Sequence, residues 1–517
     1  MTTARPALPG PTILGHPNSL FTLFFTEMWE RFSYYGMRSL LTLFLVSTAA
    51  KGGWGWSRAD AATLYGTYTF AVYATPILGG WVADQLLGMR RSILVGGLVI
   101  ATGHFALFLD TVPSFYAGLT LICIGTGLFK PNISAIVGQL YTKDNEAGRD
   151  GGYTLFYMGV NAGSFFGTLL CGYLGEKISW SYGFGLAGLF MLLGVLQFYF
   201  GQAIFGDIGL RTARSGEAEP AAVTSRREAD DAEGHVVRDR LLVVALLSFF
   251  TIFFWFAFEQ AGGSMTIFAA DYTDRVLTGV SGTLFNIVNS LMTLIPLAIM
   301  TALLVQMWRG MGRAQGLSNA LLTLALAIVW GLVLWMLARG FGADQTEVPA
   351  TWFNVLNAFF IVVLAPLFSR LWERWWNPSA PVKFGTGLVL IGVGFAVLAY
   401  GASGIERGAQ TAHVGMIYLV VAYFFHTVGE LSLSPVGLSY VSKLVPTRLL
   451  GLMFGLWYVN NAVANKLAGF SGSYIDEIAK TYSMAGFFLI FALVPIGAGL
   501  VLYAMNRWIV KKMHGVH

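Results

Sequence analysis

Residues 27–38 of this 517-residue chain read Glu-Met-Trp-Glu-Arg-Phe-Ser-Tyr-Tyr-Gly-Met-Arg, inside a long apolar run. At about 100° per residue, one helical face carries two carboxylates, two guanidinium groups and a phenol. These residues are Glu27, Glu30, Arg31, Tyr34 and Arg38. Charges at membrane depth are unstable in lipid, so they must face one another and a polar cavity. Because apolar packing stabilises a fold better than buried ions, this set indicates function more than structure.

The composition around this stretch is that of a membrane protein. Apolar residues make up 56% of the chain and charged residues only 11%, with a mean hydropathy of +0.64. Soluble domains carry about 25% charged residues, so a soluble fold would lack polar surface. The net charge of +5 is too small to indicate nucleic-acid binding, and Cys123 and Cys171 lie in apolar runs. We therefore expect no nucleic-acid partner, no disulfide framework and no zinc cluster.

Fourteen apolar segments are each long enough to cross a hydrocarbon core of ~30 Å as a helix. Strands of a barrel would alternate in polarity over about ten residues, which these segments do not. We predict an all-α, polytopic membrane protein with spans at 18–48, 60–83, 91–110, 114–138, 151–175, 182–205, 240–270, 282–308, 314–340, 350–372, 383–402, 413–443, 449–470 and 482–508.

The charges between the spans predict the orientation of the chain. Lys and Arg are about three times as frequent in the termini and every second loop as in the other loops, which places both termini in the cytoplasm. The longest polar stretch, 206–239, is rich in charges and nearly free of aromatic residues, as is typical of a flexible linker. We expect an N-terminal bundle at 1–205, this cytoplasmic linker, and a C-terminal bundle at 240–517 that includes an accessory helical pair at about 282–340.

The motif Glu-x-x-Glu-Arg-Phe-x-Tyr-Tyr-Gly at 27–36 resembles the hallmark of the proton-dependent oligopeptide transporters, a family of the major facilitator superfamily. Further resemblances follow along residues 18 to 510. They are Gly79–Asp84 with Leu87–Arg91, Phe129–Asn132, Phe156–Gly163, Trp255 with Phe258–Gln260, Trp352–Asn357, Gly429–Gly437, and Trp457 with Asn461. The resemblance implies two six-helix bundles plus two accessory helices, and a symporter that imports di- and tripeptides with protons by alternating access.

The resemblance also implies roles for individual residues. Arg38 and Lys130 would bind the peptide carboxylate, and Glu430 its amino group. The residues implied in proton coupling are Glu27, Glu30, Arg31, Lys130 and Glu259. The residues implied in peptide binding are Tyr34, Arg38, Tyr73, Lys130, Asn161, Trp255, Asn357, Glu430, Trp457 and Asn461.

The residues themselves support a bipolar site. The first half of the chain supplies the cations Arg31, Arg38 and Lys130, and the second half supplies the acids Glu259 and Glu430. A cavity between the bundles would then have a cationic wall and an anionic wall, which suits a zwitterion such as a short peptide.

Two features depart from the family pattern: the span 60–83 contains no histidine, and the accessory pair falls between Glu259 and Asn357 rather than between the two bundles.

A proton-coupled carrier of another small anion or of a drug-like substrate is the alternative on the same fold. An intramembrane hydrolase would need a nucleophile and a base at membrane depth, and the sequence offers no convincing pair. No Gly-Lys dipeptide exists, so a P-loop is excluded. We expect no enzymatic activity, no catalytic or metal-binding residues and no cofactor, with protons as the coupling ion. We expect a multi-pass protein of the cell membrane that functions as a monomer. Its expected partners are the lipid bilayer, dipeptides and tripeptides.

Overall fold

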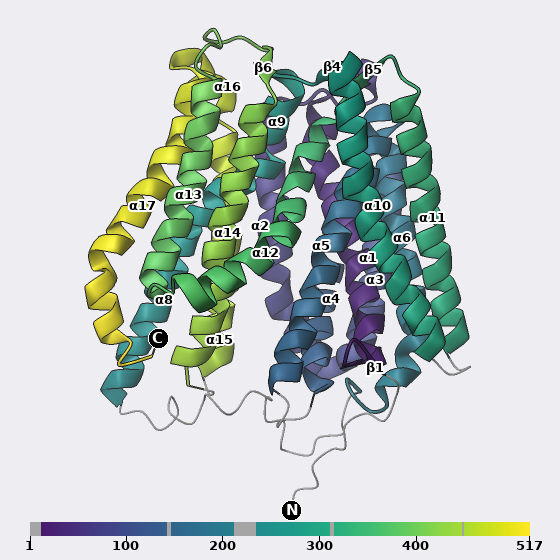
Figure 1. Ribbon diagram of the computed structural model, residues 1–517, viewed down its shortest axis with the longest axis vertical. Helices are drawn as coiled ribbons and strands as arrows, with labels where there is room; N and C mark the ends of the chain where they lie inside the picture. The colour runs from purple at the N-terminus through teal and green to yellow at the C-terminus, as the bar shows by residue number, and fades with distance from the viewer. Residues whose placement is uncertain (1–11, 142–145, 211–233, 311–314, 447–448, 517) are drawn as a thin grey trace, which may run out of the picture. The chain divides into compact units, whose positions relative to one another are not determined.

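Long helices form nearly all of the molecule, because a helix satisfies its backbone hydrogen bonds internally and can therefore lie in lipid. The structure is a computed structural model that describes residues 12–141, 146–210, 234–310, 315–446 and 449–516 (Figure 1). Within these ranges the β-structure consists of three pairs of very short strands.

Eleven helical segments of the described residues are long and apolar enough to cross a membrane. They are Met89–Phe108, Val112–Gln139, Gly151–Lys177, Trp180–Phe205, Gly234–Asp271, Gly279–Gly310, Gly316–Phe341, Ala350–Arg370, Ala380–Gly401, Ile417–Val441 and Met484–Lys512. Three further long helices, α1 (Asn18–Val46), α2 (Arg58–Val82) and α15 (Leu450–Gly472), carry more polar side chains and occupy the remaining predicted spans. The prediction of an all-α polytopic protein is confirmed.

The chain forms two compact units, which are described separately. Unit 1 comprises Met1–Leu40, Thr75–Ala221 and Val276–Trp352. Besides most of α1 and the end of α2, it contains the π-helical turn η2 (Ala83–Leu87), α3 (Met89–Phe108), α4 (Val112–Gln139), α5 (Glu146–Lys177), α6 (Trp180–Gly201), η3 (Gln202–Phe205), α10 (Gly279–Gly310) and α11 (Gly316–Phe341). Its strands pair antiparallel, β1 (Thr12–Ile13) with β2 (His16–Pro17) and β4 (Val276–Thr278) with β5 (Gln345–Glu347).

Unit 2 comprises Leu41–Ala74, Ala222–Arg275 and Phe353–His517. Besides η1 (Ala49–Lys51) and the start of α2, it contains α8 (Gly234–Phe258), η4 (Glu259–Gly262), α9 (Ser264–Asp271), α12 (Val355–Arg370), the π-helical turn η7 (Leu371–Trp375), α13 (Ala380–Gly401), α14 (Ile417–Leu444), α15, α16 (Ile475–Thr481) and α17 (Met484–Lys512). The turn η6 (Ala350–Asn354) spans the boundary between the units in the sequence, and β3 (Thr273–Asp274) pairs parallel with β6 (Val414–Gly415).

The division expected from the sequence, into bundles at 1–205 and 240–517 joined by the linker 206–239, stays a prediction. Residues 211–233 of that linker lie outside the described residues. The expected accessory pair corresponds to α10 and α11, and contacts group both helices with unit 1. Two tryptophan side chains join these helices. The Trp308 indole of α10 donates to the Thr323 hydroxyl of α11 at 3.0 Å, and the Trp330 indole of α11 donates to the Thr301 hydroxyl of α10 at 3.0 Å.

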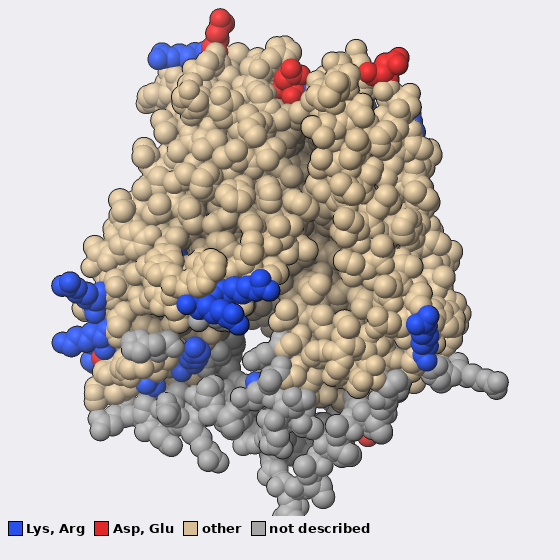
Figure 2. All heavy atoms as spheres, in the orientation of Figure 1, with Lys and Arg blue, Asp and Glu red and all other residues tan. Residues whose placement is uncertain are grey.

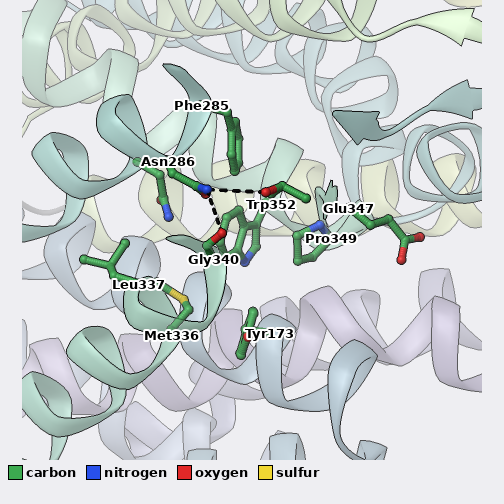
Figure 3. A pocket seen from close by; sticks show the side chains of 11 residues that line it. Tyr173, Phe285, Asn286, Met336, Leu337, Gly340, Glu347, Pro349 and Trp352 are labelled. Carbon is green, nitrogen blue, oxygen red and sulfur yellow. Dashed lines mark hydrogen bonds between the residues drawn. The ribbon is translucent and has the colours of Figure 1, made fainter. Parts of the chain in front are cut away.

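A small cavity lies where α5, α10, α11 and β5 meet (Figure 3). The Asn286 amide donates to the Gly340 carbonyl at 2.9 Å and to the Thr346 hydroxyl at 3.3 Å, while the Trp352 indole stacks on Tyr173 and Phe285. The cavity volume of about 40 Å³ suits a few water molecules and is too small for a peptide. These contacts anchor the accessory pair to α5.

Glycines set the distance between α1 and α5 in unit 1. Gly159, Gly163 and Gly167 lie four residues apart on α5, and a Cβ atom at each would collide with an α1 carbonyl oxygen, those of Phe24, Met28 and Phe32. Small residues at this spacing let two helix backbones touch, as is common between helices in membranes. The close approach places α5 directly against the helical turn that carries the charged motif of α1.

We predict that Gly163→Ala separates α1 from α5 and lowers stability. The new Cβ would meet the Met28 carbonyl and, at 2.9 Å, the Arg31 Cβ, so backbone must move. Overpacking of this kind lowers the free energy of unfolding by about 1–3 kcal/mol, visible as a lower melting temperature in detergent. Gly331→Ala is the matched control, because nothing lies within 4 Å of that position. Equal melting temperatures for both variants would contradict the proposed role of the α5 glycines.

Candidate functional site

Arg31 is buried between two carboxylates of its own helix. Its guanidinium binds the Glu30 carboxylate in a bidentate fashion, in which Nη2 donates to Oε1 at 2.6 Å and Nε donates to Oε2. The same Nε lies 3.3 Å from Oε1 of Glu27. The three residues are at most 3% exposed. Two acids therefore share one cation away from solvent, which leaves one negative charge for a second cation or a proton to compensate.

Lys130 on α4 provides further positive charge to this group. Lys130 attracts the carboxylates of Glu27 and Glu30 electrostatically. It repels the guanidinium groups of Arg31 and Arg38. The structure thus brings together the coupling residues that the sequence predicted in the first half of the chain. Four of them lie within unit 1 as one network of two acids and two bases.

Aromatic rings separate the two arginines of α1. The Arg31 guanidinium lies 5.2 Å from the Tyr34 ring centroid, and the Arg38 guanidinium lies 5.9 Å from Tyr34 and 6.0 Å from Tyr35. A cation over an aromatic face is attracted by the ring, more strongly when desolvated. Tyr34 and Arg38 are buried, at 3% and 9% exposed. Tyr35 was absent from the predicted site, although its place in the Tyr-Tyr pair could have indicated it.

Asn161 lies on α5, in the segment between Gly159 and Gly163. Its amide donates to the Tyr157 carbonyl one turn earlier at 2.9 Å, and the residue is 6% exposed. The side-chain oxygen and the second N–H of the amide take no part in this bond.

Glu430, on α14 in unit 2, has a different environment. Its Oε2 accepts from the Asn357 amide at 2.9 Å, and the same amide donates to the Thr427 hydroxyl at 3.1 Å. Glu430 is 9% exposed, and no cationic side chain of the described part of unit 2 lies within ion-pair distance of it. A buried carboxylate with neutral partners is costly unless it is protonated or meets a cation, so this acid fits a ligand's ammonium group.

Glu259 lies where the predicted span 240–270 is interrupted. Helix α8 ends at Phe258, η4 runs from Glu259 to Gly262, and α9 begins at Ser264. The Tyr65 hydroxyl donates to Oε2 of Glu259 at 3.3 Å and lies where a Cβ at Gly262 would be. Glu259 also interacts repulsively with Glu430. Helix termini inside a membrane span provide backbone groups that can bind ions.

A hydrogen-bonded set that the sequence analysis missed holds this interruption in place. The Tyr423 hydroxyl donates to Oδ1 of Asn354 at 2.9 Å, and the Asn354 amide donates to the Thr266 hydroxyl at 3.2 Å. The Thr266 hydroxyl in turn donates to the Ala261 carbonyl at 2.7 Å. Only Asn354 had a signal in the sequence, its place in the Trp352–Asn357 motif.

The remaining predicted residues of unit 2 are Tyr73, Trp255, Trp457 and Asn461. The Trp255 indole packs edge-on against Phe254 and Phe258, and its N–H has no acceptor among the described residues. The Trp457 ring meets Phe384 edge-on at 6.3 Å. Asn461 is 9% exposed with a side-chain oxygen that accepts no bond from described residues, and Tyr73 is half-buried on α2.

A family model described as the POT family matches residues 90–217 and 336–487. The peptide transporter YePEPT of Yersinia enterocolitica is 32% identical, over 92% of this chain and 91% of its own. The di-/tripeptide transporter of Lactococcus lactis subsp. cremoris is 31% identical, over 98% of both chains. The chain belongs to the POT family.

Solved structures of the POT family agree with this assignment. A mutant peptide transporter POT in complex with alafosfalin matches with a TM-score of 0.76 and 28% identity, over 98% of both chains. The resemblance stated from the motifs and the fold expected from it are confirmed. The functional roles of individual residues remain predictions.

A second charged cluster in this POT family member was absent from the sequence prediction. At the start of α2, the Arg58 guanidinium donates to Asp271 at 2.6 Å and to Asp476 at 2.8 Å, and also to the Tyr272 hydroxyl at 2.9 Å. Burial raises the pKa of Tyr272, so its hydroxyl stays protonated and donates to the Ala409 carbonyl at 2.9 Å. The cluster joins α2 to the end of α9 and to α16, and only proximity in space could reveal it.

We predict that Arg31→Met destabilises the protein strongly. Removing one partner of a buried ion pair leaves an uncompensated charge, which costs about 3–5 kcal/mol. The combined variant Glu27→Gln, Glu30→Gln, Arg31→Met removes the opposing charges together and should recover most of the loss. Melting temperatures in detergent measure both. A combined variant less stable than Arg31→Met would show that the three charges do not compensate one another.

Proposed function

We propose that the chain is a proton-coupled symporter that imports di- and tripeptides through the cell membrane by alternating access, as a monomer with both termini in the cytoplasm. Membership of the POT family and the likeness to named peptide transporters support this function. The observation that carries it is a pair of complementary environments. Unit 1 holds two acids bound to the buried Arg31, and unit 2 holds the acid Glu430, whose hydrogen-bond partner among the described residues is the neutral Asn357 amide.

These two environments fit the two ends of a peptide. In our proposal the peptide carboxylate binds Arg38 and Lys130, and the amino terminus binds Glu430, since opposite charges in a poorly solvated site attract strongly. The Asn357 amide already fixes one Glu430 oxygen at 2.9 Å and leaves the other free for the ammonium. The further residues of the proposed site are the aromatic Tyr34, Tyr73, Trp255 and Trp457, which would pack against peptide side chains, and Asn161, Asn357 and Asn461, which would bond the peptide backbone.

Coupling then follows from competition for cations. In the empty carrier, Arg31 and Lys130 stabilise the ionised carboxylates of Glu27 and Glu30. An arriving peptide carboxylate takes Lys130 as its partner, and an acid that loses its cation in a poorly solvated site binds a proton more tightly. The neutralised carrier can close and reopen inward, where peptide release restores the original pairs and expels the proton. We assign Glu259 to the same proton pathway because it is buried and interacts with Glu430.

The energy available from one proton is sufficient for accumulation. One charge that crosses 100 mV contributes about 2.3 kcal/mol, and each pH unit contributes about 1.4 kcal/mol. Since about 1.4 kcal/mol corresponds to a tenfold concentration ratio, one proton can concentrate a peptide more than tenfold.

We predict that Glu27→Gln and Glu30→Gln abolish gradient-driven accumulation of a labelled dipeptide but leave peptide–peptide counterflow. Exchange requires no net release of a proton, whereas accumulation does. Both are measured in liposomes that contain the purified variants. The control is Glu406→Gln, an exposed acid in a loop of unit 2. Wild-type accumulation and pH dependence in both helix-1 variants would show that these carboxylates have only a structural role.

We further predict that Glu430→Gln weakens binding of free dipeptides much more than binding of their N-acetylated forms. A buried ammonium that loses its charged partner costs about 2–5 kcal/mol, which corresponds to at least a tenfold rise in Kd. Competition against a labelled dipeptide measures the effect for each ligand pair. An equal loss for both forms would assign Glu430 to another role and would remove the proposed contact with the amino terminus.

A further inference from the structure

Lys383 is a buried cation without an acidic partner. It lies in the first turn of α13 and is only 8% exposed. Its Nζ donates to Oδ1 of Asn377 at 2.7 Å and lies 5.0 Å from the ring centroid of Trp372. Both partners are neutral, and no described acidic side chain lies within ion-pair distance of this ammonium group. A buried charge of this kind is unfavourable unless something anionic compensates it.

Among the side chains that the structure describes, the neighbourhood of Lys383 adds positive charge. Lys443, near the end of α14, repels Lys383 electrostatically. Arg370 ends α12 and Arg374 lies in η7; both are exposed, and neither forms an ion pair with a described residue. Figure 2 shows Lys and Arg side chains gathered over the end of α12. Four cations thus come from the end of α12, from η7, from the beginning of α13 and from the end of α14, all within unit 2.

Tryptophans frame this group, which we call the α12 basic patch (Arg370, Arg374, Lys383 and Lys443). The Trp372 and Trp376 ring centroids are 5.5 Å apart, and Phe368 packs edge-on against Trp372 at 5.8 Å. The side chain of Trp375 is 84% exposed and that of Trp376 49%. The Trp372 indole N–H is buried and has no acceptor among the described residues. Indoles beside basic residues at the end of a membrane helix are typical of the headgroup level of a bilayer.

We propose that the α12 basic patch is a binding site for one anionic phospholipid. The phosphate would compensate Lys383 and form charge-assisted hydrogen bonds with Arg370 and Arg374, since guanidinium groups match phosphate geometry. The acyl chains would lie against the exposed indoles and the apolar surface of α12. A soluble anion has no acyl chains that could cover the exposed indoles of Trp375 and Trp376. The exposure of these two rings therefore favours a lipid as the ligand. The inference depends on the chain being a membrane protein and is independent of the proposed substrate.

The test is lipid binding by native mass spectrometry of the full-length chain, delipidated in detergent. The probes are phosphatidylglycerol and phosphatidylcholine with identical acyl chains. We expect phosphatidylglycerol to be retained at least tenfold more strongly than phosphatidylcholine. Lys383→Gln should abolish that preference. Lys480→Gln removes the same charge from an exposed position on α16 and should leave the preference intact.

The variant pair Arg370→Gln, Arg374→Gln repeats the test at exposed positions, where folding is not at risk, and should also lose the preference. Equal retention of the two lipids by the wild-type chain would overturn the proposal. So would loss of the preference in Lys480→Gln to the same degree as in Lys383→Gln. Displacement of phosphatidylglycerol by inorganic phosphate at equal concentration would identify a site for a free anion and would equally overturn it.

Discussion

One guanidinium shared by two carboxylates is the interaction on which the rest of unit 1 depends. Arg31 can remain charged in the interior only because Glu30 binds it with two oxygens and Glu27 lies at 3.3 Å. The glycine contacts of α5 with Met28 and Phe32 hold α5 close to this turn of α1. A network whose charges nearly cancel is also one that a single proton or a single anion can rearrange. Stability and switching therefore have the same physical origin.

Unit 2 presents the opposite condition. Glu430 is buried with an amide as its hydrogen-bond partner, so its negative charge is not balanced by a described cation of that unit. Asn357 in turn bonds Thr427, which fixes the amide and orients the acid. The interruption at Glu259 gives the same unit a buried 3-10 turn between α8 and α9 instead of one continuous α-helix. We interpret unit 1 as the site of charge exchange and Glu430 as a receptor for a positive group.

Sequence patterns predicted the helices well because apolar length is a local property. The predicted spans 18–48 and 60–83, for example, correspond to α1 (Asn18–Val46) and α2 (Arg58–Val82). The shared face of residues 27–38 also followed from helical periodicity. The break after Phe258 was not predicted, although Glu259, Gln260, Gly262 and Gly263 interrupt the apolar run there and could have indicated it. Contacts such as Tyr65 with Glu259 or Arg58 with Asp476 join helices that are distant in the sequence, and no periodicity reports which helix faces which.

The central claim is that peptide and proton move together through this chain. Liposomes with the purified protein, loaded with a dipeptide, held at equal pH on both sides and at zero membrane potential, test it directly. If a peptide that leaves takes a proton with it, a pH-sensitive dye in the lumen will report alkalinisation that starts with peptide efflux and scales with it. Efflux of the dipeptide with no change in luminal pH would contradict coupling, and with it the assignment of Glu27, Glu30 and Arg31 as the proton-exchanging group.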